Sequence, residues 1–183
     1  LSCLLAVAAN AQNIVVDAPN IASTTNLDRP FGGGVGRYQQ WYNPNPVLTG
    51  SILEPMRITQ VEFLCGSNNA QAPQPVTVNC EVFIGHGKFS GVFGFFGSNF
   101  DDTPQQVFGP FPLQQTVGPQ GSVACTIPFN APFTWDRTRP ILLEIRVNGN
   151  SQGNQPFAFN HAGTTQLIGQ TSRVYAFGNA GAT

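Results

Sequence analysis

Alternation of apolar and polar residues is the feature that most constrains the fold of this chain. In its clearest example, from Val76 to Ile84, every second residue is valine, cysteine or isoleucine, and the residues between them are mostly polar. A period of two residues is typical of a β-strand with one buried face. Shorter runs of the same kind follow at 61–65, 123–127, 143–147, 157–159 and 174–177. No segment shows the 3.6-residue period of an amphipathic helix.

Turn-forming clusters at 43–46, 66–69 and 148–154 separate these runs, and glycine (20 residues) and proline (15 residues) are abundant. The pattern predicts about seven to nine antiparallel strands in two facing sheets, an all-β, jelly-roll-like β-sandwich. We expect this domain to span residues 31–183, after residues 1–30. The Gly- and Phe-rich segment 85–97 is expected to be a long loop or a looser strand pair whose aromatic rings pack over a sheet edge.

The charge balance excludes several classes of function. Charged residues make up only 9% of the chain and the formal net charge is −1, so the sequence offers no basic surface for nucleic acid or anionic lipid. The composition also argues against a membrane-spanning protein and a helical bundle. Because few residues are charged, the sheet edges carry few side chains that would hinder pairing with another chain.

The first residues predict the compartment. Residues 1–12 are an apolar run ending in Ala-Asn-Ala-Gln, the pattern of a signal peptide cleaved before Gln12, which predicts an extracellular or cell-surface protein. If this segment is retained, it must be buried, and a neighbouring subunit is one place for it. The following arm, to residue 30, is either a local strand or linker, or a strand donated to a neighbour. The candidate subunit-joining residues are Leu4, Leu5, Val7, Ile14, Val15 and Val16.

Four cysteines, at positions 3, 65, 80 and 125, allow three disulfide connectivities. In an exported protein at least one bond is expected, and we predict Cys65–Cys80, which closes the intervening loop. The alternative is that the cysteines on apolar strand faces are buried thiols acting as small hydrophobes. The sequence has no Cys-x-x-Cys spacing of the kind that would indicate a zinc site.

Other candidate sites have ordinary structural alternatives. His86 lies near Ser90, Asp101 and Asp102, but no nucleophile signature accompanies it, so we expect a polar loop histidine and no enzyme. Asp101 and Asp102 could offer oxygens to calcium, although Asp-Asp-Thr-Pro is also ordinary turn chemistry. We expect no metal or other cofactor.

Three carboxylates and three aromatic residues complete the candidates. The carboxylates of Glu62, Glu81 and Glu144 are expected on outward strand positions, which argues against a glycosidase. The aromatic residues, which could stack on sugar rings or pack in the core or over an edge, are Trp41, Tyr42 and Trp135.

Five segments in a fixed order carry a family resemblance. They are 36–42 (GRYQQWY), 57–63 (RITQVEF), 99–103 (NFDDT), 127–136 (IPFNAPFTWD) and 141–146 (ILLEIR). Over this span the chain resembles exported bacterial β-domain proteins of unassigned role, many of which end in a PEP-CTERM sorting tail. The resemblance implies a bacterial surface or extracellular domain and brings no catalytic residues. Unlike that group, this chain has cysteines.

Two functions remain as hypotheses. The first is a structural subunit of an extracellular fibre or surface assembly, in which copies form a homopolymer by N-terminal strand addition, as donor-strand pili do. We expect the acceptor groove to be lined by Val78, Val82, Ile145 and Val147. The alternative is a secreted carbohydrate-binding module that uses exposed aromatic rings to hold a polysaccharide.

Overall fold

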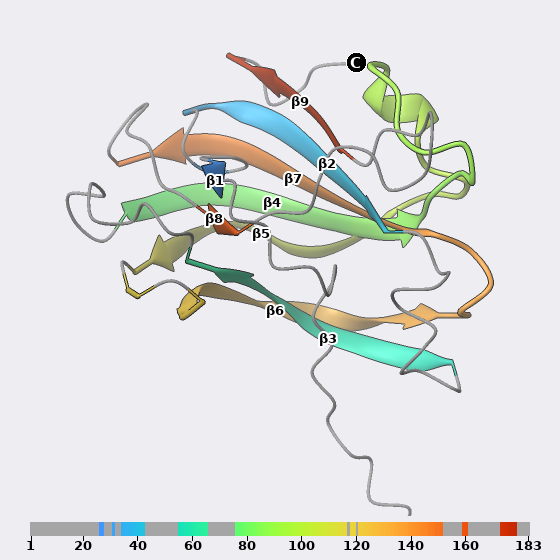
Figure 1. Cartoon of the computed structure of the whole chain (residues 1–183), viewed down its shortest axis with the longest axis horizontal. Helices are drawn as coiled ribbons and strands as arrows, with labels where there is room; N and C mark the ends of the chain where they lie inside the picture. The colour runs from blue at the N-terminus through green and yellow to red at the C-terminus, as the bar shows by residue number, and fades with distance from the viewer. Residues whose placement is uncertain are drawn as a thin grey trace, which may run out of the picture.

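The computed structural model describes residues 26–27, 31, 34–42, 55–65, 76–116, 118–119, 121–151, 159–160 and 173–178. These residues form antiparallel strands in two layers and one short 3-10 helix (Phe96–Ser98), as Figure 1 shows. The strands are β1 (Asn26–Leu27), β2 (Gly36–Tyr42), β3 (Met56–Leu64), β4 (Val76–His86), β5 (Gln105–Gln115), β6 (Val123–Trp135), β7 (Ile141–Asn150), β8 (Phe159–Asn160) and β9 (Arg173–Phe177). The predicted all-β sandwich is confirmed.

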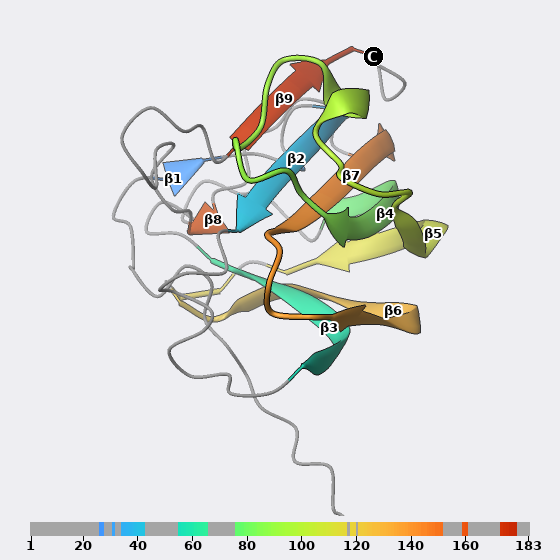
Figure 2. The same cartoon turned by 90° about the vertical axis from the view of Figure 1, so that its right-hand side faces the viewer.

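One layer is a five-stranded sheet in the order β5-β4-β7-β2-β9, and the other is the pair β3–β6. Figure 2 shows β3 and β6 beneath the larger sheet. A separate pair joins β1 to β8, so Asn26 and Leu27, within the predicted arm, pair inside their own chain. No helix in the described part of the chain is long and apolar enough to cross a membrane.

The main pairs are nested in the sequence. β4 pairs with β5, β3 with β6, and β2 with β7, so each successive pair encloses the one before it. The chain from 36 to 150 therefore folds as one long hairpin that doubles back on itself, with residues 87–104 at its tip. The jelly-roll description stays a prediction, because the second layer holds only two strands in the described ranges.

The core lies between the layers. Alternate residues of β4 and β7 point inward and pack against Ile127, Phe133 and Trp135 of β6. Those that are at most 2% exposed are Val78, Cys80, Val82, Ile84, Leu143, Ile145 and Val147. Val78, Val82, Ile145 and Val147 belong to this core. The prediction that they line an acceptor groove is therefore wrong, because β3 and β6 of the same chain already cover them.

The outer face of the large sheet is also covered, over β2 and β7. Gln39, Trp41, Leu142 and Glu144 point away from the core and yet are at most 1% exposed. Val92 packs against Trp41 and Leu142 there. Glu144, which the alternation placed outward, is thus on the expected face but buried, because the tip of the long hairpin folds back over that face.

Candidate functional site

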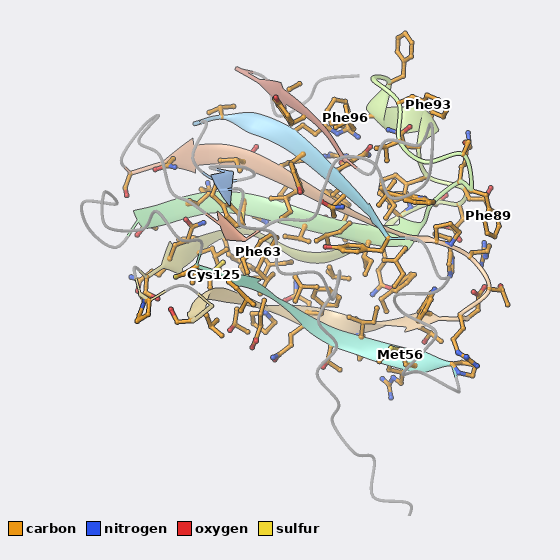
Figure 3. All side chains as sticks on the ribbon, viewed as in Figure 1. Met56, Phe63, Phe89, Phe93, Phe96 and Cys125 are labelled. Carbon is orange, nitrogen blue, oxygen red and sulfur yellow. The ribbon has the colours of Figure 1, made fainter. Side chains whose placement is uncertain are left out.

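The covering segment, residues 88–98, is called the aromatic loop below. Its inward side chains are Val92 and Phe96, which are 3% and 2% exposed, and Phe96 lies over Arg37 with its ring centroid 4.8 Å from the guanidinium carbon. Its outward side chains Phe89 and Phe93 are labelled in Figure 3 at the end of the molecule that also carries the short helix. Of the two alternatives expected for 85–97, the long loop describes residues 88–97, whereas Gly85 and His86 belong to β4. The loop covers a sheet face and not a sheet edge.

Asn99 closes the aromatic loop from below. This residue is fully buried, and its amide accepts a hydrogen bond from the Phe93 N–H over 2.9 Å and donates to the Phe93 carbonyl and to Gln39 Oε1 over 2.8 and 2.7 Å. Gln39 in turn donates to the Phe96 carbonyl over 3.1 Å, and Trp41 Nε1 donates to the Lys88 carbonyl over 2.8 Å. Side chains of β2 therefore fix the loop at three points.

A buried ionic network lies under the same loop. The carboxylate of Glu144 accepts from Arg37 Nη2 over 2.8 Å, from Gln39 Nε2 over 2.5 Å and from Arg146 Nε over 2.6 Å. Arg146 also lies over the Phe83 ring, 4.2 Å from its centroid. A buried carboxylate needs such partners, because an unpaired charge away from water is costly. The network joins β2 to β7 beneath the aromatic loop.

A second polar cluster surrounds His86, which ends β4 and is 7% exposed. Its Nδ1 lies 2.7 Å from Asp102 Oδ2, and its Nε2 lies 3.7 Å from Asp136 Oδ2. Arg139 donates to Asp136 over 3.0 Å and to Asp102 over 3.2 Å, and lies 3.7 Å from the Asp101 carboxylate. His86 is thus a buried strand residue and not the polar loop histidine expected.

The two carboxylates closest to this histidine are held ionised. Burial by itself would raise the pKa of Asp102, but hydrogen bonds from His86 and the charge of Arg139 lower it. Desolvation likewise opposes ionisation of Asp136, but hydrogen bonds from Thr138 and Arg139 outweigh it and hold the pKa of this carboxyl well below its usual range. An ionised Asp102 can only accept, so His86 Nδ1 carries the proton of their hydrogen bond.

A His–Asp pair becomes catalytic when the second ring nitrogen activates a hydroxyl or thiol. Here His86 Nε2 is buried and has no hydrogen-bond partner among the described residues. No three described His, Cys, Asp or Glu residues are placed to hold a metal ion. The calcium role considered for Asp101 and Asp102 stays a prediction. The cluster instead ties the end of β4 to residues 101–102 and to the turn at 136–139.

The aromatic residues considered for sugar stacking lie mostly inside. Trp41 is 1% exposed beneath the aromatic loop, and Trp135 is fully buried in the core, where its Nε1 donates to the Arg139 carbonyl over 2.8 Å. Tyr42 is partly buried against the core, and desolvation raises its pKa to about 12. The sugar-stacking role is therefore corrected for Trp41 and Trp135, because neither ring face is accessible.

Cys65, Cys80 and Cys125 are free, buried thiols in one core cluster. The disulfide expected between Cys65 and Cys80 is not formed in this structure, and the alternative of small buried hydrophobes describes these side chains. Desolvation, reinforced by the neighbouring Glu81 charge, raises the pKa of Cys80 to about 12, and burial raises that of Cys125 further. Cys3 lies outside the described residues.

The two edges of the large sheet differ. β5 contains Pro110 and Pro112, and its register against β4 shifts near Val82. Proline in a sheet leaves an edge without a donor at its position, which hinders the addition of another strand. β9 has neither proline nor carboxylate, and in the described part of the chain it pairs with β2 alone.

The exposed phenylalanines are the feature that sequence reasoning did not single out as a site. The aromatic loop was recognised by its composition, but four phenylalanines within eight residues do not show which rings face the sheet.

The subunit-joining candidates Leu4, Leu5, Val7, Ile14, Val15 and Val16 lie outside the described residues. In comparisons with known proteins, no family model, curated protein or solved structure matches this chain.

Proposed function

We propose that this protein is a structural subunit of an extracellular assembly whose copies join by strand addition at β9. The observation that carries the proposal is the contrast between the two edges of the five-stranded sheet. β5 is obstructed by two prolines and a shifted register, whereas β9 is a regular strand without proline or carboxylate. Natural edge strands are usually protected by such features, so an edge that lacks them suits pairing with another chain.

The backbone direction of β9 supports this use. Gly178 N–H donates to the Val35 carbonyl over 2.8 Å, and hydrogen-bonded pairs alternate along an antiparallel ladder. The next such pair toward the start of β9 is therefore Ala176 with Arg37, and the N–H of Phe177 between them is directed away from β2. An added strand would bond to β9 through the groups on that side.

The sequence offers a donor for this edge. Ile14, Val15 and Val16 form the short apolar run of the predicted arm, followed by a polar stretch. Main-chain hydrogen bonds supply affinity in strand addition, and alternate apolar side chains supply specificity. The signal-peptide pattern and the resemblance to exported bacterial β-domains support an extracellular setting. The carbohydrate-binding alternative has lost Trp41 and Trp135 as platforms, and its third candidate, Tyr42, is partly buried against the core.

The test measures assembly of the full-length chain by light scattering after gel filtration and by negative-stain electron microscopy. Phe177→Pro removes the outward N–H, and Phe177→Ala is its matched control because both lose the ring. On the donor side, Val15→Asp is compared with Ser23→Asp, which adds the same charge in the polar part of the arm. We expect filaments or higher oligomers in the wild type and both controls, and monomers in Phe177→Pro and Val15→Asp.

Monomeric wild-type protein at high concentration would overturn the proposal. Filaments that persist in Phe177→Pro would show that β9 is not the acceptor.

A further inference from the structure

We propose that the cluster around His86 is a pH-sensitive link between the two layers of the fold, which strengthens when the imidazole takes up a proton at Nε2. The observation that carries the proposal is the difference between the two ring nitrogens. Nδ1 lies 2.7 Å from Asp102 Oδ2, whereas Nε2 is buried, has no hydrogen-bond partner among the described residues and lies 3.7 Å from Asp136 Oδ2. A buried polar atom without a partner is costly and uncommon in native proteins. The proposal does not depend on assembly at β9.

Proton uptake at Nε2 changes the sign of one contact. In the neutral ring the proton is on Nδ1, because the ionised Asp102 can only accept. The bare Nε2 then lies beside the Asp136 carboxylate. Although burial opposes its ionisation, hydrogen bonds from Thr138 and Arg139 hold the pKa of this carboxyl well below its usual range. A proton taken from water makes Nε2 a donor and the ring a cation, so the contact with Asp136 becomes an attraction.

The charges around the ring favour the imidazolium. Negative groups outnumber positive ones in the cluster, whose ion-paired members are the carboxylates of Asp101, Asp102 and Asp136 and the guanidinium of Arg139. The other neighbours are uncharged, since the Phe133 ring centroid lies 5.2 Å from that of His86 and Ile141 is its register partner on β7. Burial of the ring opposes a charge on it, but a carboxylate beside each ring nitrogen offsets that cost.

The cluster joins three segments that are distant in the sequence. His86 ends β4, and its backbone is bonded to the residues just before β5: the Asp101 N–H donates to the His86 carbonyl over 2.8 Å, and the His86 N–H donates to Asp102 Oδ1 over 3.2 Å. Asp136 directly follows β6, which belongs to the other layer. A charged His86 is therefore attracted to both layers at once, and the fold should be more stable in mildly acidic than in alkaline solution.

The experiment is urea unfolding of the full-length chain at about pH 8 and about pH 5.5, on either side of the range in which histidine titrates. All buffers contain EDTA at constant ionic strength, so that no bound cation contributes. We expect the wild-type midpoint to be higher at the lower pH by about 0.5 M urea, the effect of one added hydrogen bond between charged groups. His86→Gln should abolish this rise. The matched control is His161→Gln, which removes the only other histidine of the chain and should keep the rise.

Two further measurements keep the test decisive if His86→Gln does not fold. Asp136→Asn leaves the ring and Asp102 in place and removes the carboxylate beside Nε2, so the rise should be lost, whereas Glu62→Gln, on an exposed strand position, should retain it. Nitrogen-15 NMR of the alkaline wild-type protein should show the His86 proton on Nδ1. A wild-type midpoint that is equal or lower at the lower pH overturns the proposal, as does a rise that survives in Asp136→Asn or a proton found on Nε2 in alkaline solution.

Discussion

Replacing Glu144 by glutamine tests whether the ionic network under the aromatic loop holds the outer face together. The substitution keeps the shape of the side chain and removes its charge. In the structure this carboxylate is fully buried and accepts three hydrogen bonds, two of them from Arg37 and Arg146. Arg37 is 9% exposed, so its guanidinium would keep its charge in a buried place after losing the carboxylate.

The expected cost follows from these contacts. Breaking a buried ion pair by neutralising one partner costs about 3–5 kcal/mol. The amide oxygen of glutamine can still accept one bond, and the Arg146 side chain is 30% exposed, so the lower end of that range applies. We therefore expect Glu144→Gln to lower the free energy of unfolding by about 3 kcal/mol, a large part of the 5–15 kcal/mol typical of a domain.

The assay is urea unfolding at pH 7, followed by circular dichroism. Glu62→Gln is the control, because Glu62 is an exposed strand carboxylate, and its loss should change stability by less than about 0.5 kcal/mol. A second variant, Arg37→Met combined with Glu144→Gln, should recover part of the loss, because it removes the buried charge. Equal stability of Glu144→Gln and wild type would refute the buried network.

Three further predictions concern other parts of the chain. Hydrogen bonds hold the pKa of Asp136 low against desolvation, so its ionised form stabilises the fold fully above the unfolded pKa of about 3.9 and the stabilisation is lost as the pH falls from there toward the lower folded pKa. Urea midpoints of wild type and Asp136→Asn should differ at pH 7, and the difference should begin to narrow below about pH 4. Gly109→Ala should destabilise by at least about 2 kcal/mol in thermal unfolding, because φ is +82° and an added Cβ would clash with the Cys80 carbonyl oxygen. Gly94→Ala has open space around the added Cβ and should be neutral. Equal losses in the two variants would contradict this reasoning. Cys80 and Cys125 should resist alkylation at pH 8 in the native protein and react after unfolding, as peptide mapping would show; a disulfide at either residue in the non-reduced map would contradict the free thiols.

The strands that the sequence predicted are those with one face toward the core. The alternation in β4 and β7 arises because their inward residues meet β6 across the sandwich. β2 was not predicted as a strand, since Arg37, Gln39 and Gln40 make it polar. The aromatic loop covers the outward side chains of β2 and hydrogen-bonds to them. Because the loop itself has no periodic pattern, the sequence does not show that it covers this strand.

β5 was missed for a different reason. Its sequence, QQVFGPFPLQQ, contains a glycine and two prolines, which ordinarily argue against a strand. The strand forms because it lies at the edge of the sheet, where the backbone groups on its outer side need no hydrogen-bond partner in another strand. Among the site residues, His86 could be placed near Asp102 from the sequence alone, but Asp136 and Arg139 join them only through the pairing of distant strands.

The nested pairing has a consequence for the order in which the chain folds. Closing a loop costs more entropy as the loop lengthens, and β4 with β5 encloses the shortest stretch, from Ile84 to Gln105. β3 and β6 enclose that hairpin, and β2 and β7 enclose both, so pairing that spreads outward from the tip never needs the longest closure first. Substitutions in the β4–β5 hairpin should therefore slow refolding, whereas those in β2 should mainly speed unfolding. The aromatic loop lies inside the β4–β5 hairpin, which closes first. The β2 side chains that hold the loop join the sheet last, so the loop should become ordered only at the end of folding.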